Sequence, residues 1–188
     1  MDNKHNILSV ALDLFCSGGY DAVGVQEIVE ASGVTKPTLY HYFGSKRGLL
    51  DEVLKERFML LHESVKEAAA YRGDLPMNLT EVTRVFFSFA REEKKFYRMQ
   101  LAMCFSSPES EAFKAVTKYN ENLIRLLEQM FLLASNDHGN MKGREKRYAF
   151  SFMGAINSYI TLFLSGHLSL DDNMIYQAVH QFSHGIYS

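Results

Sequence analysis

The chain has 188 residues, of which 47% are hydrophobic and 22% are charged. This composition is typical of a folded globular protein and excludes the disordered, collagen-like and low-complexity classes. The 20 basic and 22 acidic side chains give a formal net charge of −2. A nucleic acid or an anionic membrane would therefore have to be bound by a local patch rather than by the charge of the whole protein.

Cysteine usage and the N-terminal residues favour a reducing, cytoplasmic setting. Cys16 and Cys104 are too few for a disulfide framework and too far apart for a CxxC metal site. The N-terminus lacks a basic stretch followed by a small-residue cleavage site, so we expect no signal peptide. Residues 148–170 carry no Asp, Glu, Lys or Arg, but serine, threonine and asparagine interrupt the run. The run predicts a helix buried on most sides in protein rather than one that crosses a membrane.

Hydrophobic residues recur with the helical period of 3.6 throughout the chain, and no stretch alternates convincingly with the period of two that a half-buried strand requires. The sequence therefore predicts an all-α fold of about nine helices. In chain order we expect helices over about 7–18, 25–31, 36–43, 46–71, 76–93, 94–105, 108–133, 142–166 and 171–185. Gly18-Gly19 would end the first helix, Ser45 would cap the fourth, and Pro108 would lie in the first turn of the seventh.

Residues 25–43 predict two short helices joined by a tight turn. Gly33 ends the first helix, Thr35 can cap the second, and Pro37 occupies the first turn, where a missing N–H does no harm. Four apolar residues are spaced to hold the two helices together: Ile28, Val34, Leu39 and Phe43. This is a helix-turn-helix pattern, in which the second helix enters the DNA major groove and flanking residues contact phosphates.

The local charge agrees with a DNA-binding role. Residues 31–50 contain Lys36, Lys46 and Arg47 but no acidic residue. An alternative is that the two helices form an ordinary hairpin in a protein core. The short second helix argues against this, because it carries five polar or amphipathic side chains: Lys36, Thr38, Tyr40, His41 and Tyr42. We expect binding that depends on salt through a small number of phosphate contacts.

Residues 5–54 resemble the DNA-binding domain of the TetR family of bacterial transcriptional regulators. The resemblance lies in the segment ILSVALDLF, in Gly19-Tyr20, in the helix-turn-helix and in the run from Thr38 to Lys46. It implies a homodimer of nine-helix subunits, each with a DNA-binding domain over residues 1–47 and a helical ligand-binding and dimerisation domain over residues 48–188. It also implies that the last two helices form the dimer interface and that a small ligand bound in the C-terminal core releases operator DNA.

The resemblance assigns DNA-contacting roles to Gln26, Thr35, Lys36, Pro37, Thr38, Tyr40, His41, Tyr42 and Lys46. Gln26 and Lys36 are suited to the base edges of adenine and guanine, whereas Tyr42 and Lys46 are suited to phosphate. Gly24 stands where many members carry a capping Ser or Thr, so one phosphate anchor is missing. Val29 and Ser32 replace alanines at packing positions, which predicts a slightly altered crossing of the two helices.

The C-terminal region holds the candidate ligand-binding residues, although the resemblance covers little of its residue pattern. Eight of nine methionines and 19 of 24 aromatic residues follow residue 57, which fits either a large core or an adaptable apolar cavity. Two asparagines interrupt apolar helix faces and need hydrogen-bond partners if they are buried. The candidates are Phe86, Tyr97, Met103, Phe113, Asn120, Met153 and Asn157, and an ordinary core role stays open for each of them.

A stripe of small residues predicts close helix packing at the dimer interface. Gly154, Ser158, Thr161 and Ser165 repeat at i, i+4, i+7 and i+11 inside the charge-free run, and small side chains let helices approach closely. Ile175, Val179 and Phe182 of the last helix are expected to complete the bundle. Such a dimer would span two half-sites about one turn of DNA apart or more.

An enzyme is the first alternative, and the sequence offers little for it. GxSxG, GxxxxGK and HExxH motifs are absent, and His180 and His184 lack the further ligands of a zinc site. We therefore expect no catalytic residue, metal or cofactor. The expected partners are operator DNA, a small and largely apolar effector, and a second copy of the chain, with repression as the mode of action. Two alternatives stay open: an activator of the same fold, and a helical interaction protein whose helix-turn-helix no longer binds DNA.

Overall fold

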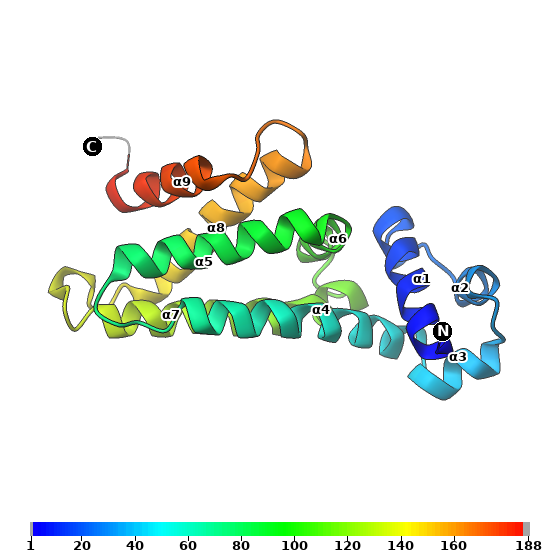
Figure 1. Cartoon of the computed structure of the whole chain (residues 1–188). Coiled ribbons are helices and arrows are strands. Elements are labelled where there is room, and N and C mark those ends of the chain that lie inside the picture. The colour runs from blue at the N-terminus through cyan, green and yellow to red at the C-terminus, as the bar shows by residue number, and fades with distance from the viewer. Residues whose placement is uncertain (1, 186–188) are drawn as a thin grey trace. The chain divides into compact units, whose positions relative to one another are not determined.

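The computed structural model describes residues 2–185, which form helices and no strands (Figure 1). The α-helices in this range are α1 (Asn3–Gly18), α2 (Val25–Ser32), α3 (Lys36–Phe43), α4 (Lys46–Ala68), α5 (Leu75–Glu92), α6 (Lys94–Cys104), α7 (Glu111–Ala134), α8 (Glu145–Leu164) and α9 (Asp172–His184), and a short 3-10 helix covers Gly139–Met141. The predicted all-α fold of about nine helices is confirmed.

The predicted place of Pro108 is wrong. Pro108 does not lie in the first turn of α7, because α7 begins at Glu111. The residues before it form a turn in which the Ser110 N–H donates to the Ser107 carbonyl at 2.9 Å. The Ser110 hydroxyl then accepts from the Phe113 N–H at 3.1 Å. A serine cap thus sets the start of the helix in place of the proline.

The chain divides into two compact units. The first unit comprises Met1–Met59 and Lys95–Tyr119, and the second comprises Leu60–Lys94 and Asn120–Ser188. Helices α4 and α7 each contribute residues to both units. The first unit therefore joins the helix-turn-helix segment to most of α6. The expected boundary between a DNA-binding domain, residues 1–47, and a ligand-binding and dimerisation domain, residues 48–188, separates functions rather than compact units. It stays a prediction.

In the first unit, α1 packs against both α2 and α3 (Figure 1). The contact follows the helical period, since Ile7, Ala11 and Phe15 of α1 are at most 1% exposed. Phe58 of α4 extends this core, because its ring centroid lies 5.3 Å from that of Phe96 and 4.7 Å from that of Tyr119. Burial of such side chains is the main favourable contribution to the stability of a small helical unit.

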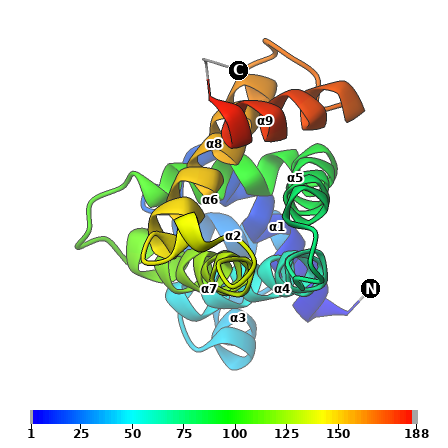
Figure 2. The same ribbon diagram turned by 90° about the vertical axis from the view of Figure 1, so that its left-hand side faces the viewer.

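In the second unit, α9 lies across α5 and α8 (Figures 1 and 2). Aromatic rings fill part of its core: the Phe152 centroid lies 4.9 Å from that of Phe182 and 6.2 Å from that of Phe131. Arg84 of α5 forms an ion pair with Asp172 at the start of α9. Because both of these side chains are exposed to solvent, the pair contributes little to stability compared with the aromatic core.

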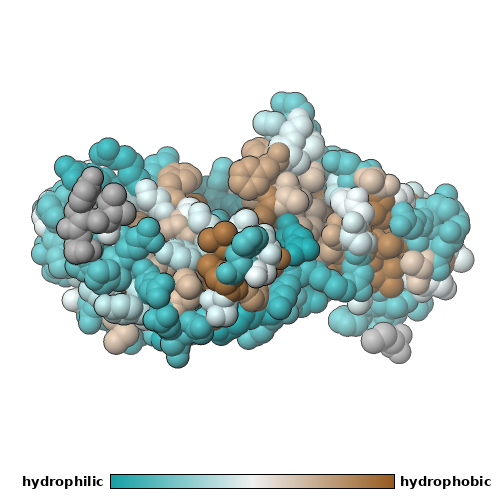
Figure 3. Space-filling model, turned by 90° about the horizontal axis from the view of Figure 1, so that it is seen from above, coloured by the Kyte–Doolittle hydropathy of each residue, from teal (hydrophilic) through white to brown (hydrophobic). Residues whose placement is uncertain are grey.

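Helix α8 is buried on one face only, whereas the sequence predicted a helix enclosed on most sides. Ala149, Phe152 and Ile156 are at most 1% exposed, but Phe150 is 53% exposed and Leu162 is 45% exposed. Figure 3 looks down on α9 and α8 and shows hydrophobic surface interrupted by hydrophilic residues over this part of the molecule. The difference arises because a single chain packs against only one side of the helix. Within residues 2–185, no helix is long and apolar enough to cross a membrane.

Candidate nucleic-acid interface

The backbone between α2 and α3 makes the tight turn that the sequence predicts. Gly33 follows the end of α2 with φ of 66° and ψ of 27°, a left-handed conformation that glycine adopts without strain. The N–H groups of Gly33 and Val34 donate to carbonyls in the last turn of α2. The Thr35 hydroxyl then caps α3 by accepting from the Thr38 N–H at 3.4 Å. These bonds fix the direction in which α3 leaves α2.

A small core holds the two helices together and against α1. Ile28 of α2 and Leu39 of α3 are both fully buried. The Asn6 side chain of α1 donates to the Ser32 carbonyl at 2.7 Å, and the Ser32 hydroxyl donates to the Ile28 carbonyl at 2.6 Å. A serine is therefore accommodated at this packing position because its hydroxyl has a partner. Gly24 precedes α2 without a side-chain cap, as predicted, while the altered helix crossing stays a prediction.

The side of α3 that points away from this core carries most of the residues expected to read bases. Lys36, Pro37, Tyr40 and His41 follow the i, i+1, i+4, i+5 spacing of one helix face and are all exposed. Tyr40 is 45% exposed, and Leu39 next to it is fully buried. No residue of α3 is acidic, so the helix itself does not repel phosphate. The shape and charge of this face suit the DNA major groove.

Lys46 lies where α4 begins, just after the end of α3. Gly44 turns the chain with φ of 70°, and the Ser45 hydroxyl caps α4, as predicted, by accepting from the Gly48 N–H at 2.9 Å. The Lys46 ammonium lies 4.2 Å from the centroid of the Tyr20 ring. This cation–π contact holds the lysine side chain while leaving it partly exposed.

The side chains of three of the predicted DNA-contacting residues form hydrogen bonds with other side chains of the chain. The Gln26 amide on α2 donates to the Glu30 carboxylate, and the hydroxyls of Thr35 and Thr38 lie 2.9 Å apart. Gln26 therefore has to leave a carboxylate before it can reach a base, and Glu30 brings a negative charge close to this residue. Tyr42 is 38% exposed. Seven of the nine residues lie on α3 or at its N-cap, Lys46 is the first residue of α4, and Gln26 lies on α2.

Tyr20 and Glu111 belong to the surroundings of Lys46, a role that the sequence did not reveal. The Tyr20 hydroxyl donates to the Glu111 carboxylate at 2.6 Å, and the Arg47 guanidinium donates to the Glu111 carbonyl at 2.9 Å. Burial of the phenol, together with its bond to Glu111, raises the pKa of Tyr20 well above the ordinary value, so the hydroxyl stays a donor at neutral pH. The one signal in the sequence was the pair Gly19-Tyr20, which contributed to the family resemblance without a role.

The predicted ligand-binding residues are divided between the two units. Tyr97, Met103 and Phe113 belong to the first unit, and Phe86, Asn120, Met153 and Asn157 belong to the second. Phe86, Tyr97 and Met103 are buried, and the other four are half-buried. Burial raises the pKa of the Tyr97 phenol, which is therefore neutral. Met103 lines a pocket of the first unit, and the ligand-binding role of the whole set stays a prediction.

The stripe of small residues on α8 faces outward. Its four members, Gly154, Ser158, Thr161 and Ser165, are all exposed. Each of the three hydroxyls donates to a carbonyl of α8 itself, at 2.8 or 2.9 Å, so a partner helix can approach without stranding a hydroxyl. Ile175 and Val179 of α9 differ, because they are 2% and 9% exposed and are already covered by their own chain. Phe182 is half-buried, and the dimer interface stays a prediction.

The helix-turn-helix region matches a known protein family. Residues 7–53 match the family described as "Bacterial regulatory proteins, tetR family". The chain is 32% identical over 98 residues to the HTH-type transcriptional activator FasR of Mycolicibacterium smegmatis, a match that covers 52% of this chain and 45% of FasR. It is 39% identical over 79 residues to the HTH-type transcriptional repressor BdcR of Escherichia coli, covering 41% of this chain and 39% of BdcR. The matches thus span less than half the length of both relatives.

Solved structures share the fold of this chain over nearly its whole length. The transcriptional regulator FadR from Bacillus subtilis, solved in complex with stearoyl-CoA, superposes with a TM-score of 0.81 and 19% sequence identity, covering 97% of this chain and 99% of that one. At this identity the likeness shows the fold. An all-α chain with an N-terminal helix-turn-helix is the architecture of a class of bacterial regulatory proteins. The helix-turn-helix region, residues 7–53, is thus similar to the TetR family of bacterial regulatory proteins.

Proposed function

We propose that the chain is a sequence-specific, DNA-binding transcriptional regulator, which acts as a homodimeric repressor and is released from its operator by a small, largely apolar molecule. The observation that carries the proposal is the exposed face of α3. Lys36, Tyr40 and His41 stand clear of a packed helix-turn-helix core, within the region that matches the family. Residues 1–47 bind DNA in this proposal, and residues 48–188 bind the ligand and the second subunit.

The predicted DNA-contacting residues fall into two groups, those that contact bases and those that contact phosphates. Gln26 and Lys36 hydrogen-bond to base edges, and Pro37 and Tyr40 offer apolar contact to thymine methyl groups. Thr35, Thr38 and His41 line the same surface. Tyr42 and Lys46 bind phosphates and set the register of the helix on the duplex. Only a few cations take part, which fits a regulator whose affinity depends moderately on salt.

Dimerisation and ligand release belong to the second part of the proposal. The outward stripe of α8, from Gly154 to Ser165, is the surface on which a second subunit would pack. Because the two reading helices must reach successive major grooves about 34 Å apart, a ligand that changes their spacing lowers operator affinity. FadR of Bacillus subtilis was solved with stearoyl-CoA, which supports a long-chain fatty acid, whose chain is apolar, as the first effector to test.

A second candidate is activation by the same fold. It is favoured by the match to FasR, which is described as a transcriptional activator, whereas BdcR is described as a repressor. Both relatives are regulators rather than enzymes, which supports a role without catalysis. Operator binding in the cytoplasm is common to both candidates.

Fluorescence anisotropy tests the proposal. The purified chain is titrated against a duplex from immediately upstream of its own gene and against a shuffled duplex, at two salt concentrations. We expect tighter binding to the upstream duplex, weakening as salt rises, and release on addition of the effector. Absence of binding to either duplex at low salt would refute the DNA-binding role and favour the interaction-protein alternative. A reporter gene placed behind the operator separates repression from activation.

A further inference from the structure

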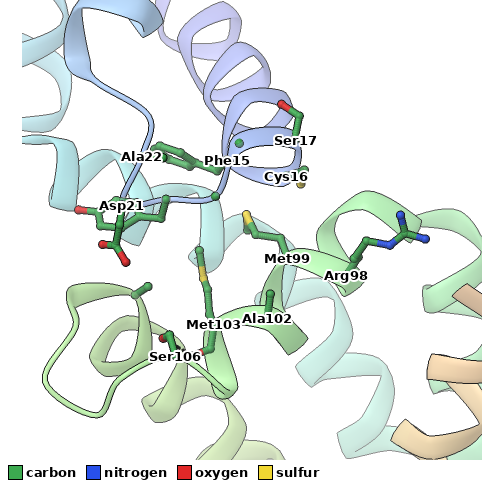
Figure 4. Close-up of a pocket in the computed structure, with 14 residues that line it drawn as sticks. Phe15, Cys16, Ser17, Asp21, Ala22, Arg98, Met99, Ala102, Met103 and Ser106 are labelled. Carbon is green, nitrogen blue, oxygen red and sulfur yellow. Dashed lines mark hydrogen bonds between the residues drawn. The ribbon is translucent and has the colours of Figure 1, made fainter. Parts of the chain in front are cut away.

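A pocket of about 490 Å³ lies within the first unit, where α6 faces the end of α1. Its walls come from the last turns of α1 and the loop that follows, from α6 and the loop after it, and from the first turn of α7. Figure 4 shows Met99 and Met103 projecting from α6 toward the end of α1, where Phe15 and Cys16 lie, while Arg98 is turned away. We call this cavity the α1–α6 pocket.

The chemistry of the α1–α6 pocket suits a small, uncharged and largely apolar molecule. Its volume falls within the range of about 300–1,000 Å³ that small-molecule sites occupy. Phe15, Met99 and Met103 supply apolar walls, and flexible thioether side chains adapt to the shape of a ligand. The charged residues at its edge, Asp21 and Arg98, are opposite in sign and both exposed. Neither sign of ligand charge is therefore favoured.

Tyr20 connects the pocket to the predicted phosphate anchor. Its side chain is 4% exposed and forms part of the pocket wall. The same ring lies 4.2 Å from the Lys46 ammonium, and its hydroxyl donates to Glu111 at 2.6 Å. The residue after Glu111, Ala112, also lines the pocket. A molecule in the pocket thus touches both the ring that supports Lys46 and the helix turn that holds this ring in place.

We propose that the α1–α6 pocket is a second effector site, separate from the ligand site proposed within residues 48–188, that it takes a small, uncharged, apolar molecule, and that its occupant shifts Lys46 through Tyr20. Binding of the molecule in the pocket is independent of the proposed function, whereas the effect on Lys46 rests on that function. An occupant that presses on the Tyr20 ring moves the surface against which Lys46 packs, so occupancy of the pocket and contact of Lys46 with phosphate oppose each other. By the reciprocity of linked equilibria, operator DNA lowers the affinity for the occupant by the same factor.

The binding half is tested with N-phenyl-1-naphthylamine, an uncharged apolar dye whose fluorescence rises in apolar sites. Ala102→Phe fills the pocket from α6, since Ala102 is an exposed residue of its wall. Ala70→Phe places the same side chain at an exposed position outside the pocket. We expect saturable binding to the natural chain and to Ala70→Phe, and at least tenfold weaker binding to Ala102→Phe. Equal dye affinity for all three chains, each folded by circular dichroism, would overturn the proposed site.

The two cysteines report where the dye binds. Cys16 lines the pocket, whereas Cys104 lies on α6 outside its wall. The chain is alkylated with N-ethylmaleimide, with and without saturating dye, and the rate at each cysteine is measured by peptide mass. We expect the dye to slow alkylation of Cys16 several-fold and to leave Cys104 unchanged. Equal protection of both cysteines would indicate a general tightening of the chain and would contradict binding in this pocket.

The coupling half is tested by operator anisotropy with and without saturating dye. We expect the dye to weaken operator binding at least fivefold, within the usual range of allosteric coupling. Glu111→Ala removes the acceptor of the Tyr20 hydroxyl at a residue that does not line the pocket. This variant should bind the dye within twofold of the natural chain and lose most of the coupling, a result that a merely structural role of Tyr20 would not produce.

The outcomes separate the two proposals. If the dye binds in the pocket and operator affinity does not change, the coupling through Tyr20 is refuted while the DNA-binding function stands. If the chain binds the operator but Ala102→Phe has no effect on the dye, the effector site alone is refuted. If no duplex is bound at low salt, the proposed function is refuted. Dye binding and cysteine protection still test whether the pocket binds an apolar molecule.

Discussion

The Lys46 ammonium lies 4.2 Å from the centroid of the Tyr20 ring, and the Tyr20 hydroxyl is bonded to Glu111 at 2.6 Å. The lysine expected to bind phosphate is therefore positioned by the loop after α1 and by the first turn of α7. An ammonium has three donors, so a contact with the ring leaves others for phosphate. Anchoring on DNA consequently depends on packing within the first unit as well as on α3.

Lys36 and Lys46 are expected to contribute to DNA binding in different ways. Lys36→Ala should lower specific affinity by about 1–3 kcal/mol and relax the preference at one base position, because Lys36 lies on the exposed face of α3. Lys46→Ala should weaken binding to all sequences and reduce the salt slope by about one. Anisotropy with the operator and single-base variants at several salt concentrations measures both effects. Identical profiles for the two variants would contradict the division into reading and anchoring.

Gly48 is expected to be required at the start of α4. A Cβ at this position would lie 2.0 Å from the Phe43 carbonyl oxygen, so the chain has to shift at the junction of α3 and α4. Gly48→Ala should destabilise the protein by about 1–3 kcal/mol, as other overpacked sites do. Gly24→Ser is the matched control, since a Cβ there meets no atom within 4 Å and adds the missing cap to α2. Its stability should rise by a few tenths of a kcal/mol.

Urea unfolding measures the two glycine variants. A lower midpoint for Gly48→Ala with an unchanged slope would show a loss of stability without a change in the surface exposed on unfolding. A Gly48→Ala protein as stable as the natural chain would contradict the close approach at Phe43.

The outward stripe of α8 is expected to form the dimer interface. Gly154→Leu fits the single chain, because residue 154 is exposed and a Cβ there meets no atom within 4 Å. In a dimer the leucine would force the two helices apart. We expect Gly154→Leu to keep its helical content, to become monomeric in light scattering and to lose operator binding. Ala70→Leu, at an exposed position away from the stripe, should stay dimeric. A dimeric Gly154→Leu protein would place the interface elsewhere.

Asp171 is expected to stabilise α9 in a pH-dependent way. Its carboxylate accepts from the Met174 N–H at 2.9 Å and from the Ser169 hydroxyl at 3.0 Å, and these bonds lower the pKa of Asp171 below its ordinary value. Because the pKa is lower in the folded than in the unfolded chain, the stabilisation is present above the ordinary value of 3.8 and is lost as pH falls through the folded-state pKa.

Thermal unfolding of Asp171 variants checks this expectation. Asp171→Ala should lower Tm at pH 7, whereas Asp171→Asn should lower it less, because asparagine also caps helices. The difference in Tm between the natural chain and Asp171→Asn should shrink in acid, where the aspartate becomes neutral. A difference that stays constant with pH would assign the effect of Asp171 to something other than its charge.

Local signals in the sequence determined the helices and the helix-turn-helix. The left-handed turn at Gly33, the caps at Thr35 and Ser45 and the apolar spacing of Ile28 and Leu39 all act within a few residues. Such backbone and capping preferences are short-ranged, so they can be read without the fold. The start of α7 shows the limit of this reading, because the bonds of Ser110 took precedence over a helix-starting role for Pro108.

Tertiary structure alone decided which side chains meet. Tyr20 and Glu111 are 91 positions apart, and only the fold of the first unit brings the phenol to the carboxylate and the ring to Lys46. Packing likewise covered Ile175 and left Gly154 exposed, although both belong to helices with a helical apolar pattern. Periodicity identifies the helices and their apolar positions, but which of these positions are buried depends on contacts between distant segments, and these contacts have no local signal.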